Sequence, residues 1–210
     1  MNALEPLVDE ARERLVARAK REGLVRVGYD VMDSPLGPLW IAVGPRGVVN
    51  IHYGATPDPR EIARITRAYG PGVLPDRRSC DRVLTELDQY FAGRRRSFDV
   101  EVDLAALTPF QQRILTATAR VPYGELTTYK VVAREAGNEQ ASRAAGAALG
   151  ANPIPIVVPC HRIVATDGTL GGYAGGLAAK RRLLALERGK TDVPAGGWEP
   201  SRRSPRAVQS

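Results

Sequence analysis

The 210-residue sequence has only two cysteines, Cys80 and Cys160, and only two histidines, His52 and His161. Two cysteines are too few for a disulfide framework, which favours a reducing, cytoplasmic setting. So few histidines disfavour a zinc site built from protein ligands alone. No apolar run approaches the ~20 residues of a bilayer span, and charges interrupt the region where a signal peptide has its apolar centre. We therefore expect neither a membrane segment nor secretion.

Acidic residues are fewer than basic ones: the chain has 23 aspartates and glutamates against 30 lysines and arginines, which gives a formal charge of +7. This balance suits a polyanionic partner such as nucleic acid, although many basic proteins bind none. Apolar residues make up 43% of the chain, enough to exclude wholesale disorder and collagen-like repeats. The length predicts one domain, or two small domains that share an interface.

The first half is expected to be structural. Apolar residues at helical spacing from Leu4 to Ala19, with Gly23 as C-cap, predict an amphipathic helix docked on another surface. Period-two alternation and intervening turns then predict an antiparallel meander with strands at Val25–Val31, Leu39–Val43 and Val48–Tyr53. A capping box at Asp58–Glu61 predicts a helix that buries Ile62, Ile65 and Tyr69. A further helix is marked by Val83, Leu87, Tyr90 and Phe91 and ended by Gly93.

Several short helices are predicted in the second half. A capping box at Thr108–Gln111 opens a helix through about Ala119. After a tight turn, two short helices at Thr128–Ala136 and Glu139–Leu149 flank Gly137-Asn138, the pattern of a helix-turn-helix. Many helical hairpins with this spacing bind nothing. The second helix is rich in alanine and carries one long cation, Arg143, so it either packs closely on a neighbouring helix or approaches a nucleic-acid backbone.

The strongest chemical signal is Cys160-His161-Arg162, which follows the apolar, proline-rich segment 152–159. A cysteine that ends an apolar strand is most often inert, but a neighbouring histidine and arginine favour the thiolate. Contact between Cys160 and His161 requires a bridging water or a sharp turn after Pro159. A base also needs an orienting group, and Glu187 on the last predicted helix is the candidate. A buried, inert cysteine beside a capping histidine remains the alternative.

A glycine-rich loop, 171–176, surrounds Tyr173. It lacks the Lys-Ser/Thr ending of a phosphate-binding loop, so no binding of nucleoside triphosphates is expected. Because its glycines leave the backbone groups unobstructed, it is expected to wrap a flat ligand instead. The final helix is predicted over Leu177–Glu187. The Pro/Ser/Arg-rich residues 190–210 are predicted to form a disordered basic tail.

The order of these motifs resembles that of the O6-alkylguanine-DNA alkyltransferases, loosely from about Val25 and densely in the second half up to Glu187. The matching segments are Phe110-Gln111, Val121–Glu125, Tyr129, Ala141–Ala144, Asn152-Pro153, Pro159–Ile163 and Gly172–Gly176. The resemblance implies an α+β fold, with a small N-terminal antiparallel sheet and helices (ribonuclease H-like) and a mostly helical C-terminal domain containing a helix-turn-helix. It divides the chain into an N-terminal helix (1–23), a structural domain (24–100), a DNA-binding and alkyl-transfer domain (101–189) and the tail (190–210).

The resemblance also implies a function: DNA repair by irreversible transfer of an alkyl group from O6-alkylguanine, and from O4-alkylthymine, to the protein's own cysteine. Each chain would act once and use no cofactor. Cys160 matches the nucleophile, His161 would activate it through water, and Glu187 would hold the imidazole. Tyr129 matches the tyrosine that donates a proton to the departing base.

DNA is the partner that the resemblance implies, bound as a duplex through the minor groove and also as a single strand. The protein would be a monomer in solution, with cooperative binding on DNA left open. Arg143 matches the side chain that fills the space left by the extruded nucleotide. The further DNA-binding residues are Thr128, Lys130, Ala141, Ser142 and Ala144. The substrate pocket is matched by Asn152, Pro155, Ile163, Tyr173, Ala174, Gly175 and Lys180.

Three features refine these expectations. The small Ala174 and Gly175 predict room for alkyl groups larger than methyl. Leu115 stands where the family commonly has tryptophan, at a packing position. Cys80 is isolated, so the zinc-binding cysteine cluster of some relatives is missing and no metal is expected.

Three other functions compete with alkyl transfer. A lesion-binding relative without repair activity would lack the nucleophile, whereas Cys160 is present. A cysteine hydrolase using Cys160, His161 and Glu187 would need an oxyanion site that nothing in the sequence indicates. A transcription regulator built on the helix-turn-helix alone would leave the cysteine motif unexplained.

Overall fold

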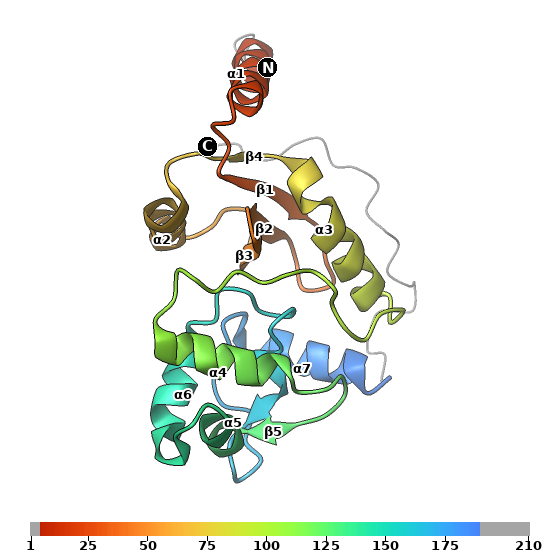
Figure 1. Ribbon diagram of the computed structural model, residues 1–210. Helices are drawn as coiled ribbons and strands as arrows, with labels where there is room; N and C mark the ends of the chain where they lie inside the picture. Colours follow the sequence, from red (N-terminus) through yellow and green to blue (C-terminus); the bar gives the residue numbers. More distant parts are fainter. Residues whose placement is uncertain (1–4, 190–210) are drawn as a thin grey trace.

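The computed structural model describes residues 5–189 and places a sheet and its helices above a mostly helical second part (Figure 1). The predicted basic tail, 190–210, lies outside the described residues. Strands β1 (Val27–Met32), β2 (Leu39–Gly44) and β3 (Gly47–Tyr53) pair antiparallel, as predicted. A fourth strand, β4 (Val73–Pro75), pairs parallel with β1 and completes the order β3-β2-β1-β4. The sequence does not predict β4 because three residues are too few to establish a period.

The two faces of the sheet are buried against different partners. On one face Trp40 and Val49 pack with Ile65 of α2 (Pro59–Tyr69), whose predicted capping box is present. The other face contributes Ile41 and Ile51 to a larger cluster that includes α3 (Arg77–Phe91) and runs into the second part of the chain. A single core therefore joins the sheet to the helical part.

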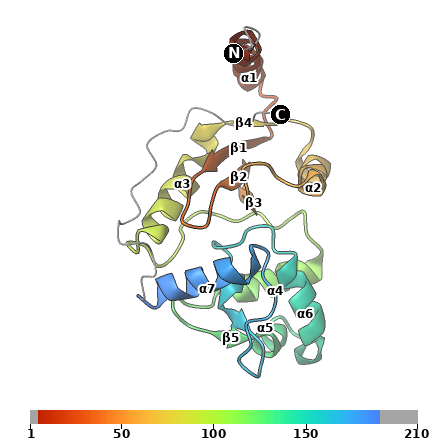
Figure 2. The ribbon, with the colours of Figure 1, turned by 180° about the vertical axis from the view of Figure 1, so that it is seen from behind.

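The N-terminal helix, α1 (Glu5–Arg21), stands away from the rest of the chain in both views (Figures 1 and 2). Its last turn makes contact, because Ala19 is buried and Lys20 pairs with Asp76 at 2.7 Å. Leu15 is 64% exposed. The predicted helix is present, but among the described side chains its docking is limited to that last turn.

The second part contains α4 (Pro109–Ala119), α5 (Tyr129–Glu135), α6 (Ser142–Gly150) and α7 (Gly176–Glu187). The predicted capping box of Thr108 and Gln111 opens α4, and Thr128 caps α5. The second helix of the predicted pair does not run unbroken over Glu139–Leu149. Residues Glu139–Ala141 form a 3-10 turn, with the side chain of Asn138 accepting a hydrogen bond from the backbone of Gln140, and α6 begins after it.

Two short elements complete this part. The 3-10 turn η2 (Cys160–Arg162) leads into β6 (Ile163–Val164), which pairs parallel with β5 (Thr127–Thr128). This pairing, which the sequence does not predict, ties the start of α5 to the residues after Cys160. Within residues 5–189, no helix combines the length and apolarity needed to cross a bilayer.

The free edge of β3 is held by the segment that crosses to the helical part. The backbone N–H of Val48 donates to the carbonyl of Glu101 at 2.8 Å, and the N–H of Asp103 donates to the carbonyl of Val48 at 2.9 Å. Gly47 has a φ of 133°, and a Cβ there would lie 2.3 Å from the Glu101 carbonyl oxygen. Only glycine therefore fits at this crossing.

Replacing this glycine tests the crossing. We expect Gly47→Ala to lower the free energy of unfolding by about 3 kcal/mol, since it adds a backbone clash to left-handed strain. Gly37→Ala is the matched control, because Gly37 has a φ of 94° with open space around it, and should cost only about 1 kcal/mol of strain. Urea denaturation followed by circular dichroism measures both values, and equal losses would contradict the role of the crossing.

Candidate active site

The segment before the cysteine does not form a strand, contrary to the interpretation of Cys160 as a strand end. The side chain of Asn152 accepts a hydrogen bond from the N–H of Ile154 and donates one to the carbonyl of Val158, both at 3.0 Å, so the segment folds back on itself. Ile156 is buried with a φ of 75°, a strained conformation that the surrounding core must hold. Cys160 then opens the 3-10 turn η2, which is the sharp turn after Pro159 that one of the two sequence alternatives required.

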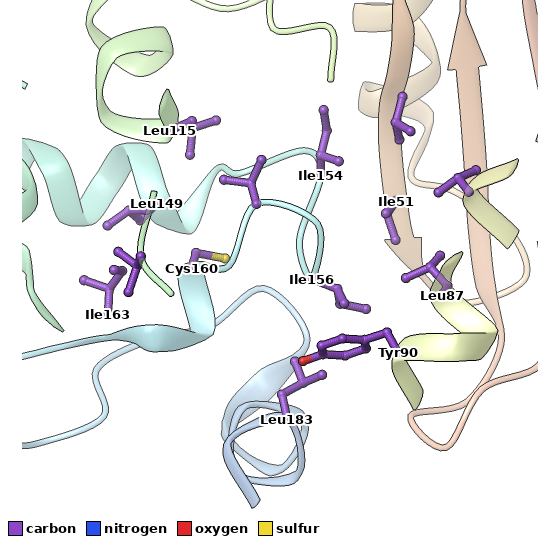
Figure 3. Close-up of a cluster of buried hydrophobic side chains, with 14 of the residues drawn as sticks. Ile51, Leu87, Tyr90, Leu115, Leu149, Ile154, Ile156, Cys160, Ile163 and Leu183 are labelled. Atoms are coloured by element: carbon purple, nitrogen blue, oxygen red, sulfur yellow. The ribbon is translucent and has the colours of Figure 1, made fainter. Parts of the chain in front are cut away.

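Cys160 is 5% exposed and lies in the helical part, with Ile154 and Ile156 between it and the sheet domain (Figure 3). The side-chain amide of Asn152 donates to its Sγ at 3.1 Å. Burial raises the pKa of the thiol to about 11, against the lowering effects of the Asn152 hydrogen bond and the Lys180 charge. The resting cysteine is therefore protonated at neutral pH, and the groups that favour its thiolate are Asn152 and Lys180 rather than the adjacent His161 and Arg162.

Lys180 is fully buried, which its position on a predicted helix did not indicate. Its Nζ donates to the carbonyl of Ile163 at 2.6 Å and to the carbonyl of Leu170. Burial lowers its pKa, and the interaction with Cys160 opposes that shift. The lysine thus joins β6 to the start of the glycine-rich loop and places a cation near the sulfur.

The structure brings His161 and Glu187 together. The Nε2 of His161 donates to Oε1 of the carboxylate at 2.8 Å. Burial lowers the pKa of His161, although Glu187 partly opposes this, so the imidazole is neutral at neutral pH. Its Nδ1 is buried and has no hydrogen-bond partner within the described part of the chain. A neutral imidazole with one free nitrogen, on the residue that follows the cysteine, is suited to accept a proton.

Glu187 also binds three groups that the sequence did not place beside it. Arg162 donates from Nη2 at 2.8 Å and from Nε at 3.0 Å, and the backbone N–H of Gly124 donates at 3.0 Å. Tyr90, from α3 of the sheet domain, donates its hydroxyl at 2.7 Å. Burial alone would raise the pKa of Glu187, but hydrogen bonds from His161 and Arg162 outweigh it and hold the value at about 2.

The sequence carries a signal for one of these partners of Glu187 and not for another. Arg162 belongs to the cysteine motif, where it was expected to favour the thiolate, but its contact with Glu187 was not predicted. Tyr90 carried only the signal of a helix core position, and nothing in the sequence links it to a residue 97 positions away.

Two tyrosines make contacts at the glycine-rich loop, Tyr129 against it and Tyr173 within it. Tyr129 begins α5, and its hydroxyl lies so close to Gly171 that a Cβ there would be 2.5 Å away. Tyr173 meets the ring of His161 edge-on at 6.4 Å between centroids, and its hydroxyl is 2.6 Å from that of Tyr53 at the end of β3. Tyr53 was not predicted as a site residue, because alternation identifies a strand position but not its partner.

The prediction that Gly175 leaves space in the pocket is wrong. Its small size was expected to leave room for a large alkyl group, but a Cβ there would lie 2.7 Å from the Tyr53 ring. Glycine therefore admits the tyrosine, and this position opens no additional space. Of the other predicted pocket residues, Ala174 is exposed, whereas Pro155 and Ile163 are buried in the core.

The predicted DNA-binding residues lie on or beside α5 and α6. Arg143 and Ala144 are exposed, and Ala141 and Ser142 are half-buried. Lys130 is exposed and pairs with Glu139 at 3.2 Å. The opposite side of α6 buries three small or apolar residues, Ala145, Ala148 and Leu149. One side of the helix therefore packs closely, while the other presents small side chains and one arginine to solvent.

Among residues 5–189, no three His, Cys, Asp or Glu side chains are close enough to hold a metal ion. Both cysteines are free, and Cys80 is fully buried under the sheet.

The fold and the site define a two-domain protein, in which a sheet domain packs against a helical domain that contains a buried cysteine, histidine and glutamate. Residues 27–104 match the family description "6-O-methylguanine DNA methyltransferase, ribonuclease-like domain". Residues 109–189 match "6-O-methylguanine DNA methyltransferase, DNA binding domain". The chain belongs to this family, which confirms the resemblance and the α+β fold predicted from the sequence.

The similarity to known proteins covers nearly the whole length of those proteins. The methylated-DNA–protein-cysteine methyltransferase of Mycobacterium tuberculosis is 38% identical over 167 residues, covering 78% of this chain and 94% of its own. That of Mycobacterium leprae is 41% identical over 160 residues, covering 75% and 90%. The structure of Mycobacterium tuberculosis OGT in complex with DNA aligns with a TM-score of 0.67 at 38% identity, over 78% of this chain and 94% of that one.

Removing the charge of Glu187 tests its position in the network. Glu187→Gln leaves the Arg162 side chain, only 7% exposed, without a counter-charge, and should lower the free energy of unfolding by about 3 kcal/mol or more. Asp30→Asn is the control, since it weakens an ion pair with Arg77, which is 70% exposed, and should cost under about 1 kcal/mol. Denaturation at pH 7 measures both, and a Glu187→Gln loss as small as the control's would contradict this assignment.

Proposed function

We propose that this protein repairs DNA by transferring an alkyl group from O6 of guanine, and also from O4 of thymine, to the sulfur of Cys160. The observation that carries this proposal is the buried hydrogen bond between Glu187 on α7 and His161, which lies in the same 3-10 turn as Cys160. Family membership supports it, since the curated relatives are named methylated-DNA–protein-cysteine methyltransferases.

The reaction needs a proton acceptor for the thiol. Cys160 rests protonated, and the free Nδ1 of neutral His161 takes the proton, directly or through water, while the Glu187 carboxylate stabilises the imidazolium. The sulfur attacks the alkyl carbon, so a C–S bond forms as the C–O6 bond breaks. Tyr129 donates a proton to the departing guanine, which neutralises its developing charge. Water then carries the proton of the imidazolium to the Tyr129 phenolate, so the net change is one proton moved from the thiol to the base.

The product is a thioether, which water does not readily cleave. Each chain therefore acts once, as a stoichiometric acceptor, and needs no cofactor. Cys160 and Cys80 are both free thiols, which suits the reducing environment of the cytoplasm, where we place the protein.

DNA binding is assigned to α5 and α6. We place α6 in the minor groove, because its exposed side carries the small Ala144 and Ala147 around Arg143 and permits close backbone approach. Thr128, Lys130, Ala141 and Ser142 border this surface. Arg143 enters the duplex where the damaged nucleotide rotates out toward Cys160. Base edges are poorly distinguished in this groove, so binding by the monomer is largely independent of sequence, and single strands bind as well.

The substrate pocket is proposed to use residues on both sides of Cys160. Asn152, Pro155 and Ile163 shape the segments before and after it, and Lys180 holds the loop that bears Tyr173 and Ala174. The extruded guanine would lie against this loop.

The two cysteines offer a matched test of the acceptor. With duplex DNA carrying labelled O6-methylguanine, we expect one label per chain, none on Cys160→Ser, and full labelling of Cys80→Ser. Cys80 is inert because it is fully buried, and burial raises its pKa to about 12. Mass spectrometry of the labelled peptide identifies the acceptor, and label on Cys80, or turnover beyond one per chain, would refute the proposal.

The role of Arg143 separates extrusion from chemistry. Arg143→Ala should slow transfer from duplex DNA by about tenfold or more, because extrusion costs a few kcal/mol that the arginine helps to offset. Transfer from a single-stranded oligonucleotide should be unchanged, since the damaged base is not paired and does not have to be extruded from a duplex. Arg134→Ala, which removes another exposed arginine, controls for the loss of one positive charge. Equal slowing on both substrates would show that Arg143 does not act in extrusion.

A further inference from the structure

The side chain of Tyr53 connects the N-terminal sheet to the glycine-rich loop 171–176. Tyr53 is the last residue of β3, and its hydroxyl is 2.6 Å from that of Tyr173, in the loop 171–176. The two rings meet edge-on, with centroids 5.9 Å apart. Since Tyr53 is remote in sequence from every motif of the helical domain, no pattern in the chain assigns it a role.

The contact is tight as well as hydrogen-bonded. A Cβ at Gly175 would lie 2.7, 2.8 and 3.0 Å from three ring atoms of Tyr53, so the loop backbone rests against the ring. Gly175 has a φ of −83°, which any residue can adopt. Glycine is therefore required here by the ring and not by backbone conformation.

Tyr53 is also held firmly on its own side. The N–H of Gly54 donates to the carbonyl of Pro38 at 2.8 Å, and the N–H of Ile51 donates to the carbonyl of Pro153 at 2.8 Å. The end of β3 is thus bound to the sheet and to the segment that leads to Cys160. Tyr173 also meets the ring of His161, the residue after Cys160, edge-on at 6.4 Å between centroids, so the pair adjoins the reactive turn.

We propose that Tyr53 is a specificity-determining residue, whose ring and hydroxyl fix the loop 171–176 beside Cys160 and so limit the size of the alkyl group that the sulfur accepts. This inference rests on the proposed function. The ring supplies a wall that cannot recede, because β3 is anchored at both Ile51 and Gly54. The hydroxyl orients Tyr173, whose ring in turn meets that of His161.

The experiment compares transfer rates from O6-benzylguanine and O6-methylguanine in the same oligonucleotide. The ratio of the two rates is independent of the fraction of active protein, so partial loss of folding does not distort it. We expect Tyr53→Ala to raise the benzyl-to-methyl ratio by about tenfold, as removal of a pocket wall does. Tyr53→Phe retains the ring and should leave the ratio within about twofold of the wild-type value. If Tyr53→Ala does not fold, Tyr53→Leu provides the smaller side chain.

Tyr69→Ala is the structural control. Tyr69 is the half-buried last residue of α2 and packs on the other face of the sheet. Its loss should lower stability and leave the ratio unchanged.

A double-mutant cycle tests the contact itself. Gly175→Ala should slow methyl transfer by about tenfold in the wild-type background, where its Cβ meets the Tyr53 ring, and by under about twofold in Tyr53→Ala, where that ring is absent. Additive effects together with an unchanged substrate ratio in Tyr53→Ala would overturn the inference while leaving the proposed function intact. Absence of any methyl transfer by the wild-type protein would instead overturn the proposed function.

Discussion

The carboxylate of Glu187 is the interaction on which the site depends. It is nearly inaccessible to water, yet it remains charged because Arg162 binds it through two nitrogens and His161, Tyr90 and Gly124 each add a donor. A buried carboxylate without such partners would take up a proton. Burial lowers the pKa of His161 and the charge of Arg162 adds to this effect, so the imidazole stays neutral and its free nitrogen can accept the thiol proton. The arginine thus supplies the counter-charge of the acid and also favours the neutral histidine.

The site belongs to both domains. Tyr90 on α3 reaches Glu187, Tyr53 on β3 reaches the substrate loop, and the edge of β3 binds the carbonyl of Pro153 ahead of the cysteine. Figure 3 shows the apolar counterpart of these links, with Ile51 and Leu87 of the sheet domain facing Ile154 and Ile156 beside Cys160. The sheet domain therefore holds the reactive turn as well as filling space behind it. A displacement of β3 would disturb the cysteine segment and the glycine-rich loop together.

Local interactions made much of the fold predictable. Asp58 and Thr108 each satisfy helix donors within three residues, so a four-residue motif was enough to locate the starts of α2 and α4. The strands of the meander were located by alternation in the first strand and by the turns around the other two, although both faces of β2 and β3 are buried. The break before α6 was missed, since the capping side chain of Asn138 competes with a helix pattern that continues across it. The turned path of 152–159 was also beyond prediction, because Asn152 bonds back to Val158 and Cys160.

The sequence by itself determined which chemical groups are available: one cysteine followed by a histidine and an arginine, one glutamate on the last helix, and a loop of glycines around a tyrosine. These are properties of residue type and short spacing, which a chain displays before it folds. Only the tertiary structure decided their ionisation and their partners, because burial and contacts between distant segments set both. The thiol is protonated, the lysine is buried, and two tyrosines from the sheet domain complete a site that the sequence predicted from the second half of the chain alone.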